Sequence, residues 1–276
     1  AAPKGALITM TQYLYDQGST TDALLRAHRR GVRVQVLVDS RARSAALTKL
    51  RKGLGTNKSR PGFVVTCRQS CMATATSIMH AKFFLFSRTG SQLNTSMITS
   101  ANPHTVNTED SWNNLHTIAN NKVLYTSLRR YFTDMLADRT NLNYYRTTSS
   151  GIYKLYLYPR TVRRSSDIVL LDVLNHVSCK KVTKGYGRQG RTQIRVAMLI
   201  WTAPRANIAR RLWQLHAQGC HVEVITNKAR VGPTAMSILL KKSKRNGQLK
   251  VYDAWVDGNR DGVGERYVHH KVVTIN

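Results

Sequence analysis

An internal repeat is the feature of this sequence that most constrains its fold. At an offset of 188 residues, Met10 corresponds to Met198 and Gly31 corresponds to Gly219. The same offset relates Leu24 to Leu212, His28 to His216, Val34 to Val222, and Val36 to Val224. A common register over this length is hard to obtain by accident, and internal repetition is a stronger guide to architecture than local patterns. The chain is therefore predicted to be a duplication.

Each copy of the repeat predicts a strand, a helix and a strand joined by short connections. The expected elements are a strand over 6–10, a helix that ends at Gly31 and a strand over 32–39, and then a strand over 194–200, a helix over 208–218 and a strand over 222–225. Such βαβ units contain parallel strands. We predict an α/β protein with two βαβ-containing halves, residues 1–150 and 151–276, whose mixed, mostly parallel sheets are related by a pseudo-two-fold axis.

The charge balance is strongly basic. The chain has 43 Lys and Arg against 14 Asp and Glu, a formal net charge of +29. This excess attracts polyanions or anionic surfaces and makes binding salt-dependent.

The hydrophobic fraction of 42% is that of a globular protein. The sequence lacks a run of about eighteen apolar residues, so no transmembrane segment is predicted. It also starts without a signal peptide and close to a core strand, so we expect it to be part of a longer precursor.

Four cysteines allow two interpretations. Cys67 and Cys71 form one close pair, while Cys179 and Cys220 stand alone. The spacing lacks the second Cys or His cluster of a zinc site. An even count with one close pair predicts the disulfides Cys67–Cys71 and Cys179–Cys220, and therefore secretion into an oxidising compartment. The alternative is four reduced, partly buried thiols.

A histidine and a lysine two residues apart occur once in each copy. His80 and Lys82 precede an apolar run, and His269 and Lys271 precede a β-branched run, at a separation of 189 for the histidines. In an extended strand, residues i and i+2 share a face. One imidazole can attack an electrophile while the other, protonated, gives a proton to the leaving group. Two ammonium groups suit the oxygens of a phosphate. This pattern predicts phosphoryl transfer with no metal and no cofactor.

These motifs resemble those of the phospholipase D superfamily, whose members carry His-x-Lys-x4-Asp twice, each followed by Gly-Ser-x-Asn. The residues that carry the resemblance are His80-Ala81-Lys82, Ser100-Ala101-Asn102 and His269-His270-Lys271. The resemblance covers essentially the whole chain, and the stretch 253–267 is most similar to secreted phospholipase D-like proteins of actinobacteria. It implies a duplicated phospholipase D-like fold. It also implies His80 as nucleophile, His269 as general acid, Lys82 and Lys271 as phosphate ligands, and Ser100 and Asn102 as supporting residues.

The sequence also departs from the family pattern. Ser87 and Asn276 stand where the motif aspartates are expected, and Thr99 replaces the glycine before Ser100. Asn113 stands where some relatives have a glutamate that orients a catalytic histidine; an amide can still hold the ring, although it stabilises an imidazolium less than a carboxylate does. The second Ser-x-Asn is missing because the sequence ends, which fits either incomplete coverage or a truncated, inactive product.

Several weaker motifs have two interpretations. The run 257–262 has the Asp-x-Asn-x-Asp pattern of a calcium loop but lacks the expected later glutamate, so a polar turn is favoured. His28 and His216 are interpreted as packing or surface residues, and His104 as a residue of the pocket or of a solvated loop. The basic stretches 180–188 and 241–245 are interpreted as solvated faces or as phosphate contacts.

Three functions remain open from the sequence. The first is a secreted nuclease, because a cationic chain with available Tyr and Trp suits nucleic acid. The second is a phospholipase D that acts on phospholipid head groups at an anionic membrane surface. The third is a polyanion-binding protein that kept the fold and lost turnover. Phosphodiesterase (hydrolase) activity is favoured over binding alone, and nucleic acid is favoured over lipid.

Overall fold

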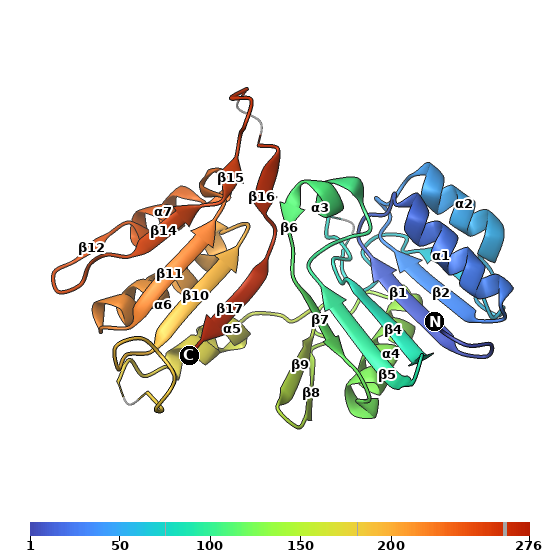
Figure 1. Ribbon diagram of the computed structural model, residues 1–276, viewed down its shortest axis with the longest axis horizontal. Helices are drawn as coiled ribbons and strands as arrows, with labels where there is room; N and C mark the ends of the chain where they lie inside the picture. Colours follow the sequence, from blue (N-terminus) through green and yellow to red (C-terminus); the bar gives the residue numbers. More distant parts are fainter. Residues whose placement is uncertain (75, 181, 262–263) are drawn as a thin grey trace. The chain divides into compact units, whose positions relative to one another are not determined.

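The computed structural model describes residues 1–74, 76–180, 182–261 and 264–276 (Figure 1). The chain divides into two compact units, each with its own core. Unit 1 comprises Ala1–Glu109 and Leu115–Thr161, and unit 2 comprises Asp110–Asn114 and Val162–Asn276. Unit 2 therefore includes a five-residue segment that interrupts unit 1 in the sequence.

Unit 1 is a sheet with helices on both faces. In the described residues its strands lie in the order β3-β2-β1-β4-β5-β7. Helices α1 and α2 pack on one face, and α4 packs on the other. All of β1 is buried, as expected for a strand covered on both faces. Its elements are β1 (Leu7–Gln12), α1 (Gly18–Arg29), β2 (Arg33–Val38), α2 (Ala45–Leu54), β3 (Phe63–Thr66), β4 (Phe83–Thr89), β5 (Gln92–Thr99), α3 (Thr105–Glu109), β7 (Leu115–Ile118), α4 (Lys122–Leu136), β8 (Arg146–Ser150) and β9 (Tyr153–Leu157).

Unit 2 is built around a smaller sheet with strand order β14-β11-β10-β17 in the described residues. Helices α5, α6 and α7 cover it with an apolar core. The interrupting segment supplies β6, which pairs in parallel with β16. The elements are β6 (Ser111–Trp112), η1 (Ser165–Asp167), α5 (Val169–Asn175), β10 (Gln193–Met198), η2 (Ala203–Arg205), α6 (Ala206–Ala217), β11 (His221–Thr226), η3 (Lys228–Arg230), α7 (Pro233–Leu239), β12 (Lys242–Ser243), β13 (Gly247–Gln248), β14 (Lys250–Asp253), β15 (Trp255–Val256), β16 (Arg266–Val268) and β17 (Lys271–Ile275).

The predicted duplication is visible in the order and pairing of the elements. The unit β1-α1-β2 corresponds to β10-α6-β11, and the first strand of each pairs in parallel with the second. Antiparallel β4 lies beside β1, just as antiparallel β17 lies beside β10. The predicted α/β class with mixed sheets is confirmed. In unit 1, however, parallel pairing is limited to β1, β2 and β3, because β4, β5 and β7 are joined antiparallel.

The strand register corrects one correspondence of the sequence repeat. Met10 pairs with Val36 in β2, whereas Val224, the counterpart of Val36, pairs with Val196. Met10 therefore corresponds to Val196 and not to Met198, because the connection between β10 and α6 is two residues longer than that between β1 and α1. An even shift keeps each side chain on its own face of the strand, so the hydrophobic pattern hides the insertion.

The four cysteines form the two predicted disulfides, Cys67–Cys71 in unit 1 and Cys179–Cys220 in unit 2. All four side chains are buried. Among the described residues, no helix has the length and apolar character needed to cross a membrane.

Candidate functional site

The first His-x-Lys motif lies immediately before β4 in unit 1. The sequence predicts that His80 and Lys82 lie side by side on a strand, but β4 begins only at Phe83. The His80 side chain is exposed, whereas Lys82 is 5% exposed and its Nζ donates to the His80 carbonyl at 3.0 Å. Tyr13, which follows β1, lies with its ring centroid 5.1 Å from the His80 ring and 5.5 Å from the Lys82 Nζ. Tyr13 was not identified from the sequence, because its proximity depends on the pairing of β1 with β4.

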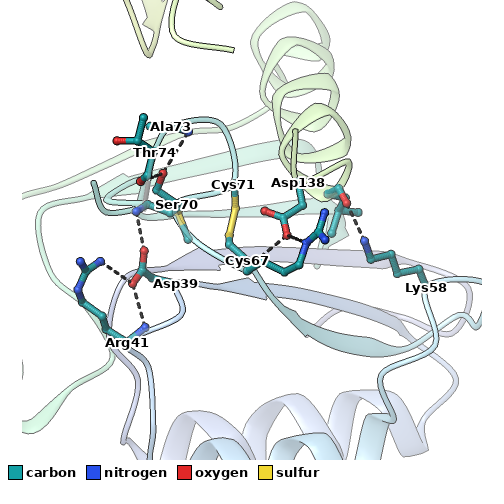
Figure 2. Close-up of a disulfide and its surroundings, with 12 residues drawn as sticks. Asp39, Arg41, Lys58, Cys67, Ser70, Cys71, Ala73, Thr74 and Asp138 are labelled. Atoms are coloured by element: carbon teal, nitrogen blue, oxygen red, sulfur yellow. Dashed lines mark hydrogen bonds and ion pairs between the residues drawn. A yellow bond between two sulfur atoms is a disulfide. The ribbon is translucent and has the colours of Figure 1, made fainter. Parts of the chain in front are cut away.

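A buried carboxylate, Asp39, fixes the backbone beside His80. Figure 2 shows Asp39 with its contacts to Arg41. Asp39 follows β2, is fully buried, and its Oδ2 accepts the Met79 N–H at 2.6 Å. Its Oδ1 accepts the Arg41 N–H at 3.0 Å and lies 3.5 Å from the Arg41 guanidinium. Asp39 thus links the end of β2 to Met79, the residue that precedes His80. The sequence signal was present, since a carboxylate at the carboxyl end of a parallel strand commonly faces a site.

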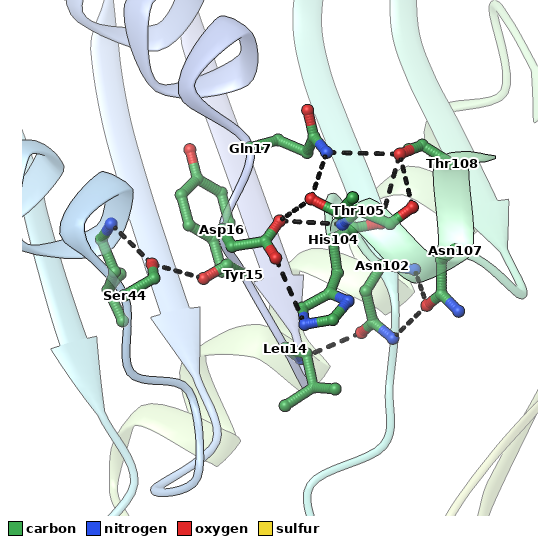
Figure 3. A network of polar contacts seen from close by, with 11 residues as sticks. Leu14, Tyr15, Asp16, Gln17, Ser44, Asn102, His104, Thr105, Asn107 and Thr108 are labelled. Carbon is green, nitrogen blue, oxygen red and sulfur yellow. Dashed lines mark hydrogen bonds and ion pairs between the residues drawn. The ribbon is translucent and has the colours of Figure 1, made fainter. Parts of the chain in front are cut away.

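Asn102 holds the connection that carries Tyr13 (Figure 3). Its Oδ1 accepts the N–H groups of Tyr13 and Leu14 at 3.2 and 3.0 Å, and its Nδ2 donates to Asn107 Oδ1 at 2.7 Å. Asn102 is 4% exposed, and Ser100 is 6% exposed. The buried amide therefore positions the loop after β1, and through it the Tyr13 ring beside His80.

His104 is part of a neighbouring polar network rather than a freely solvated loop (Figure 3). Its Nε2 lies 3.3 Å from Asp16 Oδ2. The other oxygen of Asp16 accepts the Thr105 N–H at 2.9 Å, at the first residue of α3. These contacts join the loop after β1 to α3, so His104 braces the same loop that Asn102 holds.

The second His-x-Lys motif lies just before β17 in unit 2. His269 is 8% exposed, and its Nδ1 lies 2.7 Å from Asn113 Oδ1. The Lys271 Nζ donates to the His269 carbonyl at 2.7 Å, and its backbone N–H donates to Asn114 Oδ1 at 3.2 Å. Asn113 in turn donates from Nδ2 to the Ser111 carbonyl at 3.0 Å. The segment Asp110–Asn114 therefore orients the histidine of this motif. With Nδ1 donating to an amide oxygen, Nε2 is the nitrogen that can exchange a proton.

The two motifs share a local geometry. In each, the lysine ammonium donates to the carbonyl of the histidine two residues earlier, Lys82 to His80 and Lys271 to His269. Partial removal from water lowers the pKa of Lys271 to about 8. Burial, followed by the charge of Lys271, also lowers the pKa of His270. The cationic form of Lys271 is therefore easier to deprotonate than that of an ordinary lysine.

The residues at the motif-aspartate positions bind backbone amides. Ser87 Oγ accepts the Leu7 N–H at 2.8 Å, and Asn276 Oδ1 accepts the Gly187 N–H at 3.2 Å. Both contacts join the strand that follows a motif to a backbone segment of the same unit. A hydroxyl or an amide can accept such a hydrogen bond in place of a carboxylate. These substitutions are thus compatible with a folded site.

The first part of the chain also matches a known family. Residues 3–136 match the family model described as "Cardiolipin synthase, PLD-like domain". Residues 3–136 are thus similar to a phospholipase D-like domain. The matched range contains the first His-x-Lys motif.

Solved structures resemble the chain in fold. The polyphosphate kinase from Porphyromonas gingivalis matches with a TM-score of 0.52 and 16% identity over 89% of this chain, and the chain spans only 36% of that protein. A phospholipase D family member, Nuc from Salmonella typhimurium, matches with a TM-score of 0.39 and 21% identity over 50% of this chain and 81% of its own. No curated protein sequence matches. The first likeness shows a fold in common with that kinase over most of this chain.

An apolar cavity adjoins the first His-x-Lys motif. Its volume is about 380 Å³. The hydroxyls of Ser70 and Tyr131 in its wall donate to backbone carbonyls, of Thr74 at 3.2 Å and of Tyr158 at 2.8 Å. Burial also raises the pKa of Tyr131 above the range of an exposed tyrosine. The cavity residues come from the disulfide loop, the motif, α4 and β9, and include Met72, Met79, His80, Lys82, Phe83, Leu128, Met135 and Leu157.

The weaker sequence motifs have structural roles in the described residues. His28 Nδ1 lies 3.2 Å from the Val32 carbonyl, and the buried His216 Nε2 lies 3.2 Å from the Gly247 carbonyl, so both are packing residues. In the calcium-loop-like run, Asp257 accepts the Asp261 N–H at 3.1 Å, as in a polar turn. Glu265 also approaches these two carboxylates but accepts the Gly258 N–H. Gly262 in this run, and Lys181 in the first basic stretch, lie outside the described residues.

Proposed function

We propose that the protein is a phosphodiesterase that hydrolyses a P–O bond through a phosphohistidine, without a metal. His80 Nε2 attacks phosphorus, and the leaving oxygen takes a proton from His269. Water then attacks the phosphorus and gives a proton to His269, which releases a phosphomonoester and restores His80. Lys82 and Lys271 bind the non-bridging oxygens, whose charge grows in the transition state.

One observation carries this proposal. Two motifs far apart in the sequence have the same contact between the lysine ammonium and the histidine carbonyl, at 3.0 and 2.7 Å. Repetition of the geometry supports a common task, because packing alone does not require a cation at the same place in each copy. The mechanism requires both motifs to face one phosphate. We propose that the halves 1–150 and 151–276 meet about a pseudo-two-fold axis for this purpose.

We propose nucleic acid as the substrate, because a net charge of +29 suits a polyphosphate chain. A phospholipid is the second candidate, and a specific observation favours it: an apolar cavity of about 380 Å³ opens beside His80 and Lys82. We further propose that the protein is secreted and belongs to the subgroup found in actinobacteria. The two disulfides support an oxidising compartment.

Purified protein incubated with plasmid DNA, RNA and phosphatidylcholine vesicles, with and without EDTA, tests the proposal. His80→Ala should abolish cleavage, whereas His176→Ala, an exposed histidine of α5's C-terminus outside both motifs, should leave it unchanged. Loss of cleavage with EDTA would refute the metal-free mechanism. Cleavage of lipid but not of nucleic acid would establish the second candidate, and binding without any cleavage would show a polyanion-binding protein.

A further inference from the structure

Unit 2 contains a long basic region with almost no acidic residue. Between residues 173 and 252 the sequence has sixteen Lys and Arg and a single carboxylate, Glu223. That carboxylate lies 3.2 Å from the Arg195 guanidinium and is paired in register with Lys250 on the neighbouring strand. Its charge is therefore offset locally, and Glu223 is the one acidic residue among those that line the cavity described next.

A cavity lies between the end of the first basic stretch, 180–188, and the segment that follows the second stretch, 241–245. It has a volume of about 330 Å³. Arg188 contributes from the first stretch, and Asn246, Gln248 and Lys250 contribute from the segment that follows the second. His216 and His221 also line it. Arg188 and Lys250 are both exposed, so their charged groups can reach a ligand at the mouth. The fold therefore gathers cations and amide donors around one concave site.

This cavity lies at the opposite end of the unit 2 sheet from the second His-x-Lys motif. His221 begins β11 and pairs with Gln193 at the start of β10. Lys271 pairs with Met198 at the end of β10. At about 3.3 Å per residue, these ends are separated by roughly 17 Å. The cavity is thus a separate site of unit 2 and not an extension of the motif.

An exposed tyrosine, Tyr186, precedes the cavity residue Arg188 by two positions in the sequence. Tyr186 is 64% exposed, the most exposed tyrosine among the exposed large hydrophobic residues of the described chain. Its turn is anchored, because the Tyr186 N–H donates to the Thr183 carbonyl at 3.0 Å and the Arg188 N–H donates to the Arg191 carbonyl at 2.8 Å. An exposed aromatic ring on an anchored turn, close in the sequence to a cation, can stack on a base of a single-stranded nucleic acid. An anionic lipid surface does not need such a ring.

We propose that unit 2 carries a second, non-catalytic binding site for single-stranded nucleic acid. Arg188 and Lys250 bind backbone phosphates, Gln248 donates hydrogen bonds, and Tyr186 stacks on a base. The site holds a strand away from the cleaved bond, so long substrates bind more tightly than short ones. The identity of the polyanion rests on the proposed function, but binding itself does not depend on catalysis.

The test measures binding of a fluorescent 20-nucleotide single-stranded DNA by anisotropy over a range of salt concentrations. It uses His80→Ala protein, so that the DNA stays intact and a failure of the catalytic proposal does not affect the result. Each single-strand phosphate contact contributes about 0.7 to the salt slope. Arg188→Gln/Lys250→Gln should therefore lower the slope by about 1.4. Arg29→Gln/Arg30→Gln removes the same charge from exposed residues of unit 1 and is the matched control.

A second variant tests the stacking ring. Tyr186→Ala should weaken binding at least about fivefold, the lower limit for the loss of one stacked base. Tyr153→Ala, which removes a tyrosine of unit 1 that is 41% exposed, should leave the affinity unchanged. The proposal is overturned if Arg188→Gln/Lys250→Gln has the same salt slope of DNA binding as its control, Arg29→Gln/Arg30→Gln. It is also overturned if Tyr186→Ala binds DNA normally, or if these variants lose binding only to anionic vesicles.

Discussion

Asn113 offers the sharpest test of the second motif. Its Oδ1 lies 2.7 Å from His269 Nδ1, and it comes from the segment of the sequence that interrupts unit 1. If His269 is the general acid, Asn113 holds the protonated ring and directs Nε2 to the leaving oxygen. Asn113→Ala removes this acceptor and leaves the imidazolium with one hydrogen bond fewer.

The size of the effect follows from the type of contact. A hydrogen bond to a charged group contributes about 1.5–3 kcal/mol. At about 1.4 kcal/mol per tenfold change, Asn113→Ala should reduce kcat/KM by roughly 10- to 150-fold. Asn113→Asp keeps the acceptor and adds a negative charge, which favours the imidazolium. It should retain more activity than the alanine variant, and the alkaline limb of its pH profile should move to higher pH.

The assay is the hydrolysis of bis(p-nitrophenyl) phosphate between pH 5 and 10, with circular dichroism as the control for folding. Asn114→Ala is a useful comparison, because Asn114 contacts the backbone of Lys271 and not the histidine ring. The reasoning is refuted if Asn113→Ala is as active as the wild type. It is also refuted if Asn113→Asp has an unshifted profile and the same loss of activity as Asn113→Ala.

Two further predictions concern Lys271 and Asp39. The pKa of Lys271 is lowered to about 8, and the ammonium form binds phosphate, so kcat/KM should fall as the pH rises through about 8. Lys271→Arg should remove the fall centred near pH 8 and leave the alkaline limb that depends on His269. A fall near pH 8 that persists in Lys271→Arg would assign it to another group. Asp39→Ala leaves the buried Met79 N–H without its acceptor, which should lower the free energy of unfolding in urea by about 1–3 kcal/mol. Asp39→Asn, which retains an acceptor, should lower the free energy of unfolding by less. Equal stability of Asp39→Ala and the wild type would contradict the proposed role of Asp39.

Part of the fold was predictable because it depends on local pattern and repetition. The βαβ units follow from hydrophobic periodicity and from a turn glycine, Gly31 or Gly219, in each copy; both have positive φ, of 84° and 103°. The two disulfides followed from the cysteine count and spacing. The antiparallel strands of unit 1 did not follow, because periodicity shows that a segment is a strand but does not show its neighbour or its direction.

The candidate site also has a part that the sequence predicted and a part that only the structure showed. The sequence alone showed the two His-x-Lys motifs, and the family resemblance implied Ser100, Asn102 and a histidine-orienting role for Asn113. Only the tertiary structure decided that this histidine is His269, 156 residues later, and that Asp39 holds the residue before His80. It also decided that the end of one basic stretch and the segment after the other border one cavity. The physical reason is that such contacts depend on strand register and on the path of connections, and neither leaves a periodic trace in the sequence.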